Sequence, residues 1–271
     1  MTITQKATSH VRFRTDIEGL RALAVLAVVI NHAGFSALPG GFLGVDIFFV
    51  ISGFLITRNI CRDLDAGKFK FGAFFGRRIR RLFPALVATV IVTLCISYLL
   101  LTPRLALSTA KSAISAVISL SNIWFLSEVS YFDSLATQKP LLHTWSLGVE
   151  EQFYLIWPFL LLLAGSLVGR RGYIIMMAGF GLLSLIAAQI WLLKSPSATF
   201  YLTHFRLFEF AIGGLIAALY PKGVRKKFAT SIWCIGLIIT FSSLIMFDKT
   251  TPMPGAWSLV PCLGVAMIIM A

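Results

Sequence analysis

Residues 77–101 read RRIRRLFPALVATVIVTLCISYLLL, an arginine cluster followed by a long run without a charged side chain. An α-helix rises about 1.5 Å per residue, so about 20 apolar residues cross the roughly 30 Å hydrocarbon core of a bilayer. The stretch therefore predicts a membrane helix over residues 80–101 with basic residues at one end.

The rest of the chain has the same character. Of its 271 residues, 58% are hydrophobic and 13% are charged, whereas soluble domains have about 25% charged residues. This composition excludes an ordinary soluble enzyme, a disordered protein and a coiled coil. We predict an all-α polytopic transmembrane helical bundle of about eight to ten membrane helices. Besides residues 80–101, the predicted helices cover residues 17–35, 43–60, 145–164, 172–193, 203–220, 229–247 and 256–271.

The net charge of +13 is concentrated in four regions. They are the N-terminal stretch, residues 58–81, residues 170–171 and residues 222–227. Membrane proteins concentrate Lys and Arg in cytoplasmic loops, which predicts a multi-pass protein with its N-terminus in the cytoplasm. We interpret residues 1–13 as a cytoplasmic arm, and we expect contact with membrane lipid and no nucleic-acid partner.

The segment between residues 102 and 143 has to begin and end on the same side of the membrane if this orientation holds. Its central part is unusually polar, with Ser112, Ser115, Ser119, Ser121 and Asn122. Irregular or polar backbone at membrane depth has to lie inside protein or line a wet cavity. The segment is either re-entrant, parallel to the membrane, or a pair of crossings.

The last apolar run, residues 256–271, has no flanking charge, and the chain stops inside it. Membrane helices normally have polar or aromatic anchors at both ends. We therefore expect residues 14–271 to form a membrane domain that is a fragment or a truncated gene product.

Five ionisable residues map to the outer ends or outer halves of predicted helices: His32, Asp46, His143, Glu150 and Glu151. Ionisable groups in membrane helices are costly and are functional candidates by default. Histidine and carboxylate side chains are also the usual general acids and bases. We select these five as candidate catalytic residues, with histidines at the headgroup level as the alternative interpretation.

Arg206 and Glu209 are three residues apart on a predicted helix, so they share a face and can pair. The pair either holds helices together or serves the acceptor side of a site.

A second group of candidate residues lies at the opposite, cytoplasmic ends of the predicted helices. Arg77, Arg78 and Arg81 begin a helix, and Arg21 lies near the inner end of the first one. Guanidinium groups bind phosphate in a bidentate manner, which predicts a clamp for a phosphorylated donor. The alternative is simple anchoring to anionic lipid.

No Walker motif, nucleophile elbow or zinc-protease motif occurs, and the four cysteines have no metal-ligand spacing. We therefore predict no metal site. The two-ended arrangement also fits a transporter of an acyl-bearing or ionic solute, although we find no inverted repeats. A structural membrane protein is a third possibility.

Several motifs resemble the membrane-bound acyltransferase 3 family. They are DIEGLRALA at residues 16–24 followed by His32, GFLGVDIFFVISGFLI at residues 41–56, Arg78-x-x-Arg81, HTWSLGVEEQFY at residues 143–154, and RLFEFAIG at residues 206–213. The resemblance covers residues 13–271. The family domain usually has about ten membrane helices, which implies that this membrane domain lacks one or two final helices. Some members of the family also carry an additional soluble domain.

The resemblance implies an O-acyltransferase of the bacterial inner membrane. Its donor would be acetyl-CoA or another acyl-CoA on the cytoplasmic side, acting as a co-substrate with no tightly bound cofactor. Its acceptor would be a carbohydrate hydroxyl outside, in O-antigen, exopolysaccharide, lipo-oligosaccharide or peptidoglycan. The family pattern makes His32 the candidate catalytic histidine and Arg21, Arg78 and Arg81 the donor-side arginines, and Glu150 and Glu151 lie in the family signature. We further expect Glu150 or Asp46 to orient His32.

Overall fold

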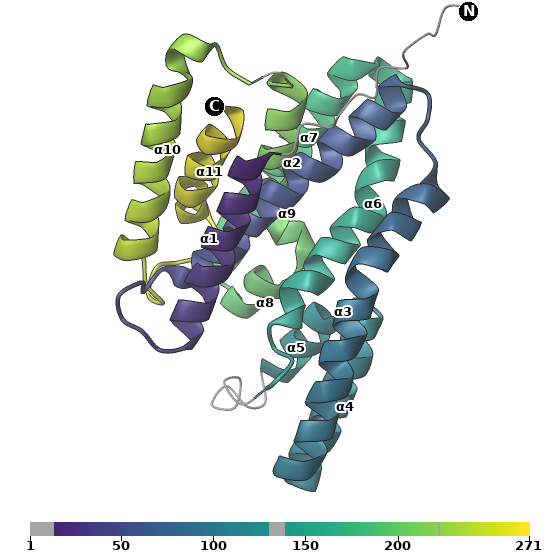
Figure 1. Ribbon diagram of the computed structural model, residues 1–271, viewed down its shortest axis with the longest axis vertical. Helices are drawn as coiled ribbons and strands as arrows, with labels where there is room; N and C mark the ends of the chain where they lie inside the picture. The colour runs from purple at the N-terminus through teal and green to yellow at the C-terminus, as the bar shows by residue number, and fades with distance from the viewer. Residues whose placement is uncertain (1–13, 130–138, 222) are drawn as a thin grey trace, which may run out of the picture.

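The computed structural model describes residues 14–129, 139–221 and 223–271, and all regular structure in these ranges is helical (Figure 1). The helices are α1 (Thr15–His32), α2 (Gly44–Asp65), α3 (Phe71–Leu100), α4 (Pro103–Val117), α5 (Ser121–Val129), α6 (Thr144–Val168), α7 (Arg170–Leu192), α8 (Pro196–Tyr201), α9 (Thr203–Leu219), α10 (Lys226–Met246) and α11 (Leu259–Met270), with 3-10 turns at Gly41–Leu43 and Ala256–Ser258. The helical bundle predicted from composition is thereby confirmed. The N-terminal arm, residues 1–13, and Lys222 lie outside the described residues.

Each predicted helix has a counterpart, but one boundary is wrong by about nine residues. We expected a helix near residue 80, whereas α3 begins at Phe71 and runs for 30 residues. Arginine is a good helix former, so the basic cluster continues the helix instead of preceding it. Consequently Arg77, Arg78 and Arg81 lie within α3 and not in its first turn.

Five helices are long and apolar enough to cross a bilayer: α2 with its preceding turn, α3, α6, α7 and α10. They differ in how far the protein encloses them. In its most apolar stretch, α2 is 72% buried, whereas α3 is 11% buried. Helix α2 is therefore the central helix, and α3 presents most of its surface outward.

Helices α4 and α5 account for most of the segment that has to return to the side it left. With 15 and 9 residues, they are about 22 and 14 Å long, well short of a bilayer core. Ser121 Oγ donates to the Thr144 carbonyl at 2.7 Å, and Asn122 Nδ2 donates to the Tyr201 carbonyl at 3.0 Å. The polar side chains therefore lie inside protein, and the lengths favour an element that does not cross. Residues 130–138 lie outside the described part.

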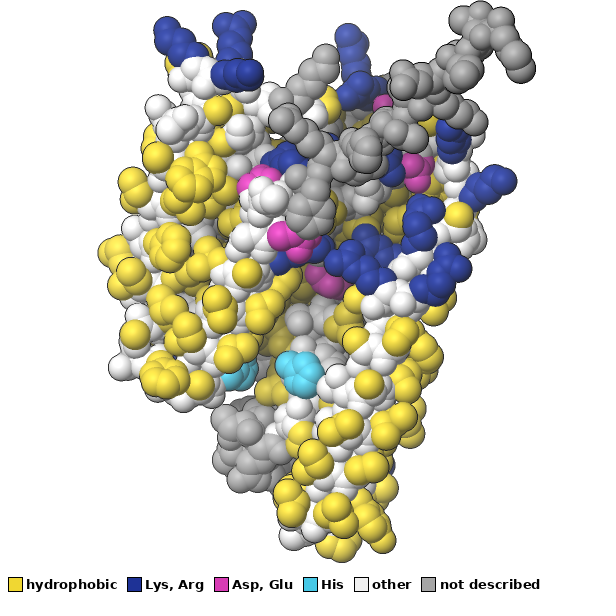
Figure 2. All heavy atoms as spheres, in the orientation of Figure 1, with side chains coloured by type: hydrophobic (Ala, Val, Ile, Leu, Met, Phe, Trp, Pro, Cys, Tyr) yellow, Lys and Arg dark blue, Asp and Glu magenta, His cyan; other side chains and the backbone are white. Residues whose placement is uncertain are grey.

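The basic regions gather at one end of the bundle. In Figure 1 the α2–α3 connection, the α6–α7 connection and the start of α10 all lie at the upper end. Gly169, with φ +65°, makes the sharp turn between α6 and α7 there. Lys and Arg side chains are concentrated in the same part of the surface (Figure 2). The helices thus alternate in the way that the positive-inside rule requires.

The contact between α2 and α9 is the most extensive in the bundle. It depends on two glycines: Gly53 lies against the backbone of Phe210, and Gly213 lies against the backbone of Val50. A Cβ atom at either glycine would collide with backbone, which cannot rotate away. Close approach through small residues is the usual way in which membrane helices pack.

We therefore expect Gly53→Ala to force α2 and α9 apart and to destabilise the protein by about 1–3 kcal/mol, as overpacking does. Gly179→Ala on α7 is the matched control, because a Cβ atom there meets nothing within 4 Å. Thermal unfolding in detergent checks this. Equal unfolding temperatures for the two variants would contradict the packing described here.

Candidate active site

An ion cluster lies at the centre of the bundle, where α2 meets α9. Arg206 Nη1 is 3.0 Å from Asp46 Oδ1 and 2.7 Å from Glu209 Oε1. Arg206 and Asp46 are each 2% exposed, and Glu209 is fully buried. A charge buried to this extent requires a partner, and here one guanidinium serves two carboxylates.

Aromatic rings enclose the guanidinium. The Cζ atom of Arg206 lies 5.4 Å from the centroid of Phe49 and 5.5 Å from the centroids of Trp145 and Phe200. These rings come from α2, α6 and α8. Cation–π contacts at such desolvated positions add to the ionic attraction. The pairing predicted for Arg206 and Glu209 is present, and the surroundings favour the interpretation that it holds helices together.

A second polar cluster connects α2, α6 and α3. Ser52 Oγ donates to Glu150 Oε1 at 2.5 Å, and Tyr154 Oη donates to Ser52 Oγ at 3.1 Å. The Cζ atom of Arg78 lies over the Tyr154 ring, 4.5 Å from its centroid. The charges of Arg78 and Arg21 both act on Glu150. The structure therefore brings together Arg78, Arg21 and Glu150, which are far apart in the sequence.

Glu151 lies beside this cluster and has an unsatisfied atom. Its Oε1 is buried and has no hydrogen-bond partner among the described residues. The charges of Glu150 and Arg78 both act on it. A buried carboxylate oxygen without a donor is costly, so Glu151 is a candidate for contact with a ligand.

Two of the other predicted donor-side arginines, Arg77 and Arg81, are exposed. Arg77 Nη2 is 3.4 Å from Asp63 Oδ2, and its side chain is 56% exposed. Arg21 pairs with Glu18 at 3.0 Å, and Arg81 is exposed. Of the four arginines, Arg78 lies over the Tyr154 ring and Arg77 is engaged with Asp63.

His32 and His143 lie near each other with exposed side chains. His32 ends α1, and its Nδ1 is 2.8 Å from the Val28 carbonyl. His143 immediately precedes α6. Desolvation by the surrounding protein lowers the pKa of His143 from its ordinary value of 6.5; the charge of His32 acts in the same direction, and the Pro140 backbone opposes it. His143 is therefore mainly neutral at pH 7 and able to accept a proton.

The expectation that Asp46 or Glu150 orients His32 does not fit this arrangement. Asp46 is bound to Arg206 in the core, and Glu150 accepts a hydrogen bond from Ser52. The His32 ring instead contacts the backbone of its own helix. Both carboxylates were assigned from their depth along the helices, which does not reveal the face on which a side chain lies.

Two members of the second cluster, Ser52 and Tyr154, were missed as site residues. Both lie inside motifs that we quoted, and each interrupts an apolar run with a hydroxyl. A hydroxyl inside an apolar helix is a weak signal of a functional site, because Ser and Thr often bond the backbone of their own helix. Only the three-dimensional structure shows that these two hydroxyls bond each other and Glu150.

On the face shown in Figure 2, Lys and Arg side chains lie with acidic side chains in the upper part, and histidine side chains lie lower. The molecule therefore has a basic end, a buried region of hydroxyl and carboxylate groups, and a histidine end. Such an arrangement can bind an anionic group at one end and exchange a proton at the other.

Known proteins show the same sequence pattern. The family described as an acyltransferase domain matches residues 14–271. A peptidoglycan O-acetyltransferase of Listeria monocytogenes is 39% identical over 272 residues, covering 95% of this chain and 44% of the relative. An O-acetyltransferase of Staphylococcus aureus is 34% identical over 238 residues, covering 83% of this chain and 39% of the relative. The chain thus spans less than half the length of these relatives. No solved structure matches it.

The ion cluster allows a stability test. We expect Arg206→Met to destabilise the protein by about 3–5 kcal/mol, because it leaves two carboxylates unpaired in the core. Adding Asp46→Asn and Glu209→Gln to this variant removes the unpaired charges and recovers part of the loss. Arg62→Met, which breaks an exposed pair with Asp63, is the control with a cost of about 0–1 kcal/mol. Unfolding in detergent measures all three, and an Arg206→Met protein as stable as the control would refute the assignment.

Proposed function

The chain belongs to the acyltransferase-domain family, and from this premise we propose that it is an integral-membrane O-acyltransferase acting on cell-wall carbohydrate. The names of the Listeria and Staphylococcus relatives support acetyl as the acyl group, and the former supports peptidoglycan as the acceptor. The membrane setting agrees with five helices that are long and apolar enough to cross a bilayer.

The observation that carries the proposal is the placement of Arg78. It lies at the basic end of the molecule, with its guanidinium on the Tyr154 ring and its charge acting on both Glu150 and Glu151. We infer that Arg78 binds a phosphate of acyl-CoA as the donor enters from the cytoplasm, with Arg21, Arg77 and Arg81 forming the approach to it. Bidentate hydrogen bonding makes arginine suited to this role.

At the other end, His32 and His143 are the candidate bases. In the proposed step the acceptor hydroxyl oxygen attacks the thioester carbonyl carbon, and the C–S bond breaks. His32 takes the hydroxyl proton, and the leaving thiolate of CoA takes a proton in turn, so the products are an O-acyl ester and free CoA. An acyl-imidazole on His32 is the two-step form of the same transfer.

The location follows from the same reasoning. We propose a bacterial cytoplasmic membrane as the site of action, with the N-terminus and the basic end in the cytoplasm. The basic end then faces the compartment that supplies acyl-CoA, and the histidine end faces the cell wall. Anionic lipid headgroups are the expected neighbours of the exposed arginines.

We expect Arg78→Lys to raise the KM for acetyl-CoA about tenfold, because lysine cannot bind phosphate in a bidentate manner or stack on Tyr154 in the same way. Arg80→Lys is the matched control, since Arg80 is exposed on the same helix. The measurement is release of CoA by wild type and variants in proteoliposomes supplied with a peptidoglycan disaccharide.

In the same assay His32→Ala is expected to abolish transfer while the folded protein persists. An Arg78→Lys variant that is indistinguishable from Arg80→Lys would contradict the donor site. Full transfer by His32→Ala would contradict the catalytic assignment but leave the donor site standing.

A further inference from the structure

A cavity of about 420 Å³ lies beside the histidine end, between α4, α5 and the segment that leads into α6. Its size falls within the usual range of small-molecule sites, about 300–1,000 Å³. Residues on its wall that bear polar groups include Ser108, Ser112, Trp124, Glu128 and Lys139. It is separate from the Arg78 cluster, and no role described so far uses it.

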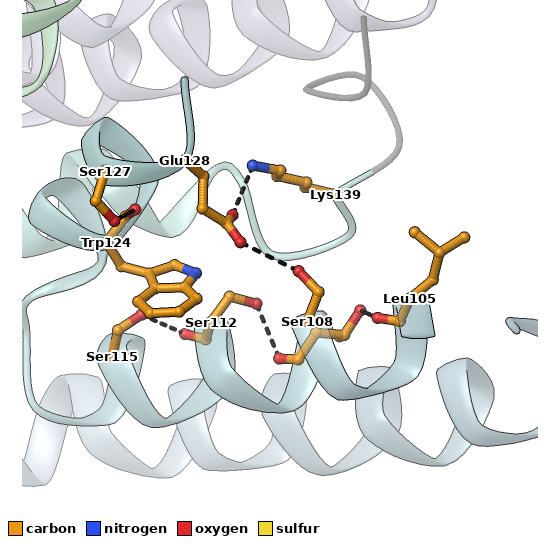
Figure 3. A network of polar contacts seen from close by, with 9 residues as sticks. Leu105, Ser108, Ser112, Ser115, Trp124, Ser127, Glu128 and Lys139 are labelled. Carbon is orange, nitrogen blue, oxygen red and sulfur yellow. Dashed lines mark hydrogen bonds and ion pairs between the residues drawn. The ribbon is translucent and has the colours of Figure 1, made fainter. Parts of the chain in front are cut away.

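The indole N–H of Trp124 marks this cavity as a binding site. The Nε1 atom is buried and has no hydrogen-bond partner among the described residues. Figure 3 shows it on the side of the ring that faces Glu128 and Ser112. Buried donors are almost always satisfied, so an unsatisfied donor on the wall of a cavity implies a group that occupies the cavity.

The rest of the wall is held in place by its own bonds. Lys139 Nζ is 2.6 Å from Glu128 Oε2, and Ser108 Oγ donates to Glu128 Oε1 at 3.3 Å (Figure 3). Ser112 Oγ donates to the Thr109 carbonyl at 2.8 Å, which leaves its lone pairs available as acceptors. The wall also includes Arg104 and Lys111, so the cavity presents the Trp124 N–H, cationic side chains, several acceptors and an aromatic ring.

This combination fits a carbohydrate that also carries an acidic group. Sugar hydroxyls both donate and accept hydrogen bonds, so they match a wall with a free N–H, a serine hydroxyl and a carboxylate. Glu128 neutralises Lys139, but Arg104 and Lys111 give the wall a net positive charge, which attracts the carboxylate of an acidic sugar such as muramic acid. The indole adds an apolar face of the kind that sugar rings contact.

The cavity also lies next to a candidate base. Pro140 is on its wall, and the backbone of Pro140 interacts with the His143 ring. A glycan in the cavity would thus have part of its length close to the histidine end, where the proposed transfer takes place.

We propose that this cavity is a subsite for the carbohydrate acceptor, in which Trp124 Nε1 donates a hydrogen bond to a sugar oxygen. The inference rests on the proposed function for the identity of the acceptor. It adds Trp124, Ser112 and Glu128 as residues that bind the acceptor and take no part in binding the donor.

The test measures, by calorimetry, how the peptidoglycan disaccharide N-acetylglucosaminyl-N-acetylmuramic acid binds to the full chain in detergent. Trp124→Phe keeps an aromatic ring but removes the N–H, and we expect about tenfold weaker binding. Glu128→Gln is the second variant, with a similar loss. Ser127→Ala is the control, because Ser127 is exposed on α5 and bonds only the Trp124 carbonyl among the hydrogen bonds described.

The unfolding temperature separates binding from folding. Removal of an unsatisfied donor should leave it unchanged, whereas a purely structural indole N–H would lower it when lost. Unchanged disaccharide affinity in both variants, or no binding by the wild type, would overturn the proposal. Affinity of the wild type for phosphatidylglycerol vesicles alone would do the same, since it indicates a lipid site.

Kinetics distinguish this inference from the proposed function. If both hold, Trp124→Phe raises the KM for the disaccharide and leaves the KM for acetyl-CoA unchanged. If Trp124→Phe transfers the acyl group with an unchanged KM for the disaccharide, the subsite is refuted and the proposed function is kept. Disaccharide binding that depends on Trp124, without any acyl transfer, would keep the subsite and refute the proposed function.

Discussion

A guanidinium buried between two carboxylates determines how the centre of this bundle is built. Arg206 on α9 cannot remain charged in an apolar interior unless Asp46 on α2 and Glu209 stay within bonding distance. That requirement sets the register of α9 against α2, and the glycines Gly53 and Gly213 let the two helices approach closely enough to satisfy it. Since α2 is the most enclosed of the membrane-length helices, its position influences the rest of the bundle.

The register of α2 in turn positions the polar cluster on α6. Trp145, near the start of α6, covers Arg206, and Glu150, further along the same helix, accepts a hydrogen bond from Ser52 on α2. These two contacts fix α6 against α2 at two points. Tyr154 follows one turn later and provides the ring on which Arg78 lies. Helix α3 is mostly exposed along its apolar stretch, and this contact helps to hold its basic end against the bundle, together with the buried Phe74 and the stacking of Phe71 on Phe159.

Much of the fold was predictable because a bilayer imposes helix length and charge distribution directly. The apolar runs located the helices, and the Lys and Arg clusters placed three connections at one end. The start of α3 was missed because arginine is common both in helices and in cytoplasmic loops. Residues 71–80 therefore did not reveal whether they belong to the helix or to the loop before it. The short helices α4 and α5 were ambiguous because their polar side chains are satisfied by residues distant in the sequence, such as Tyr201.

The site was predictable at the level of residue types and ends of the molecule, but not of partners. The charge pattern separated arginines from histidines correctly, because depth in the membrane follows from position along a helix. It could not show that Asp46 faces Arg206 instead of His32, or that Arg78 alone reaches Tyr154, because helix rotation depends on packing. The cavity beside Trp124 was also not visible, since it joins residues from α4, α5 and the segment before α6.

The central claim is that donor and acceptor meet this protein from opposite ends. The direct measurement uses sealed proteoliposomes of known protein orientation, with acetyl-labelled acetyl-CoA confined to one compartment and a peptidoglycan disaccharide confined to the other. The account predicts labelled disaccharide only when the donor is on the side of the α2–α3 connection and the acceptor is on the opposite side. Label transfer only when both substrates share one compartment would contradict it.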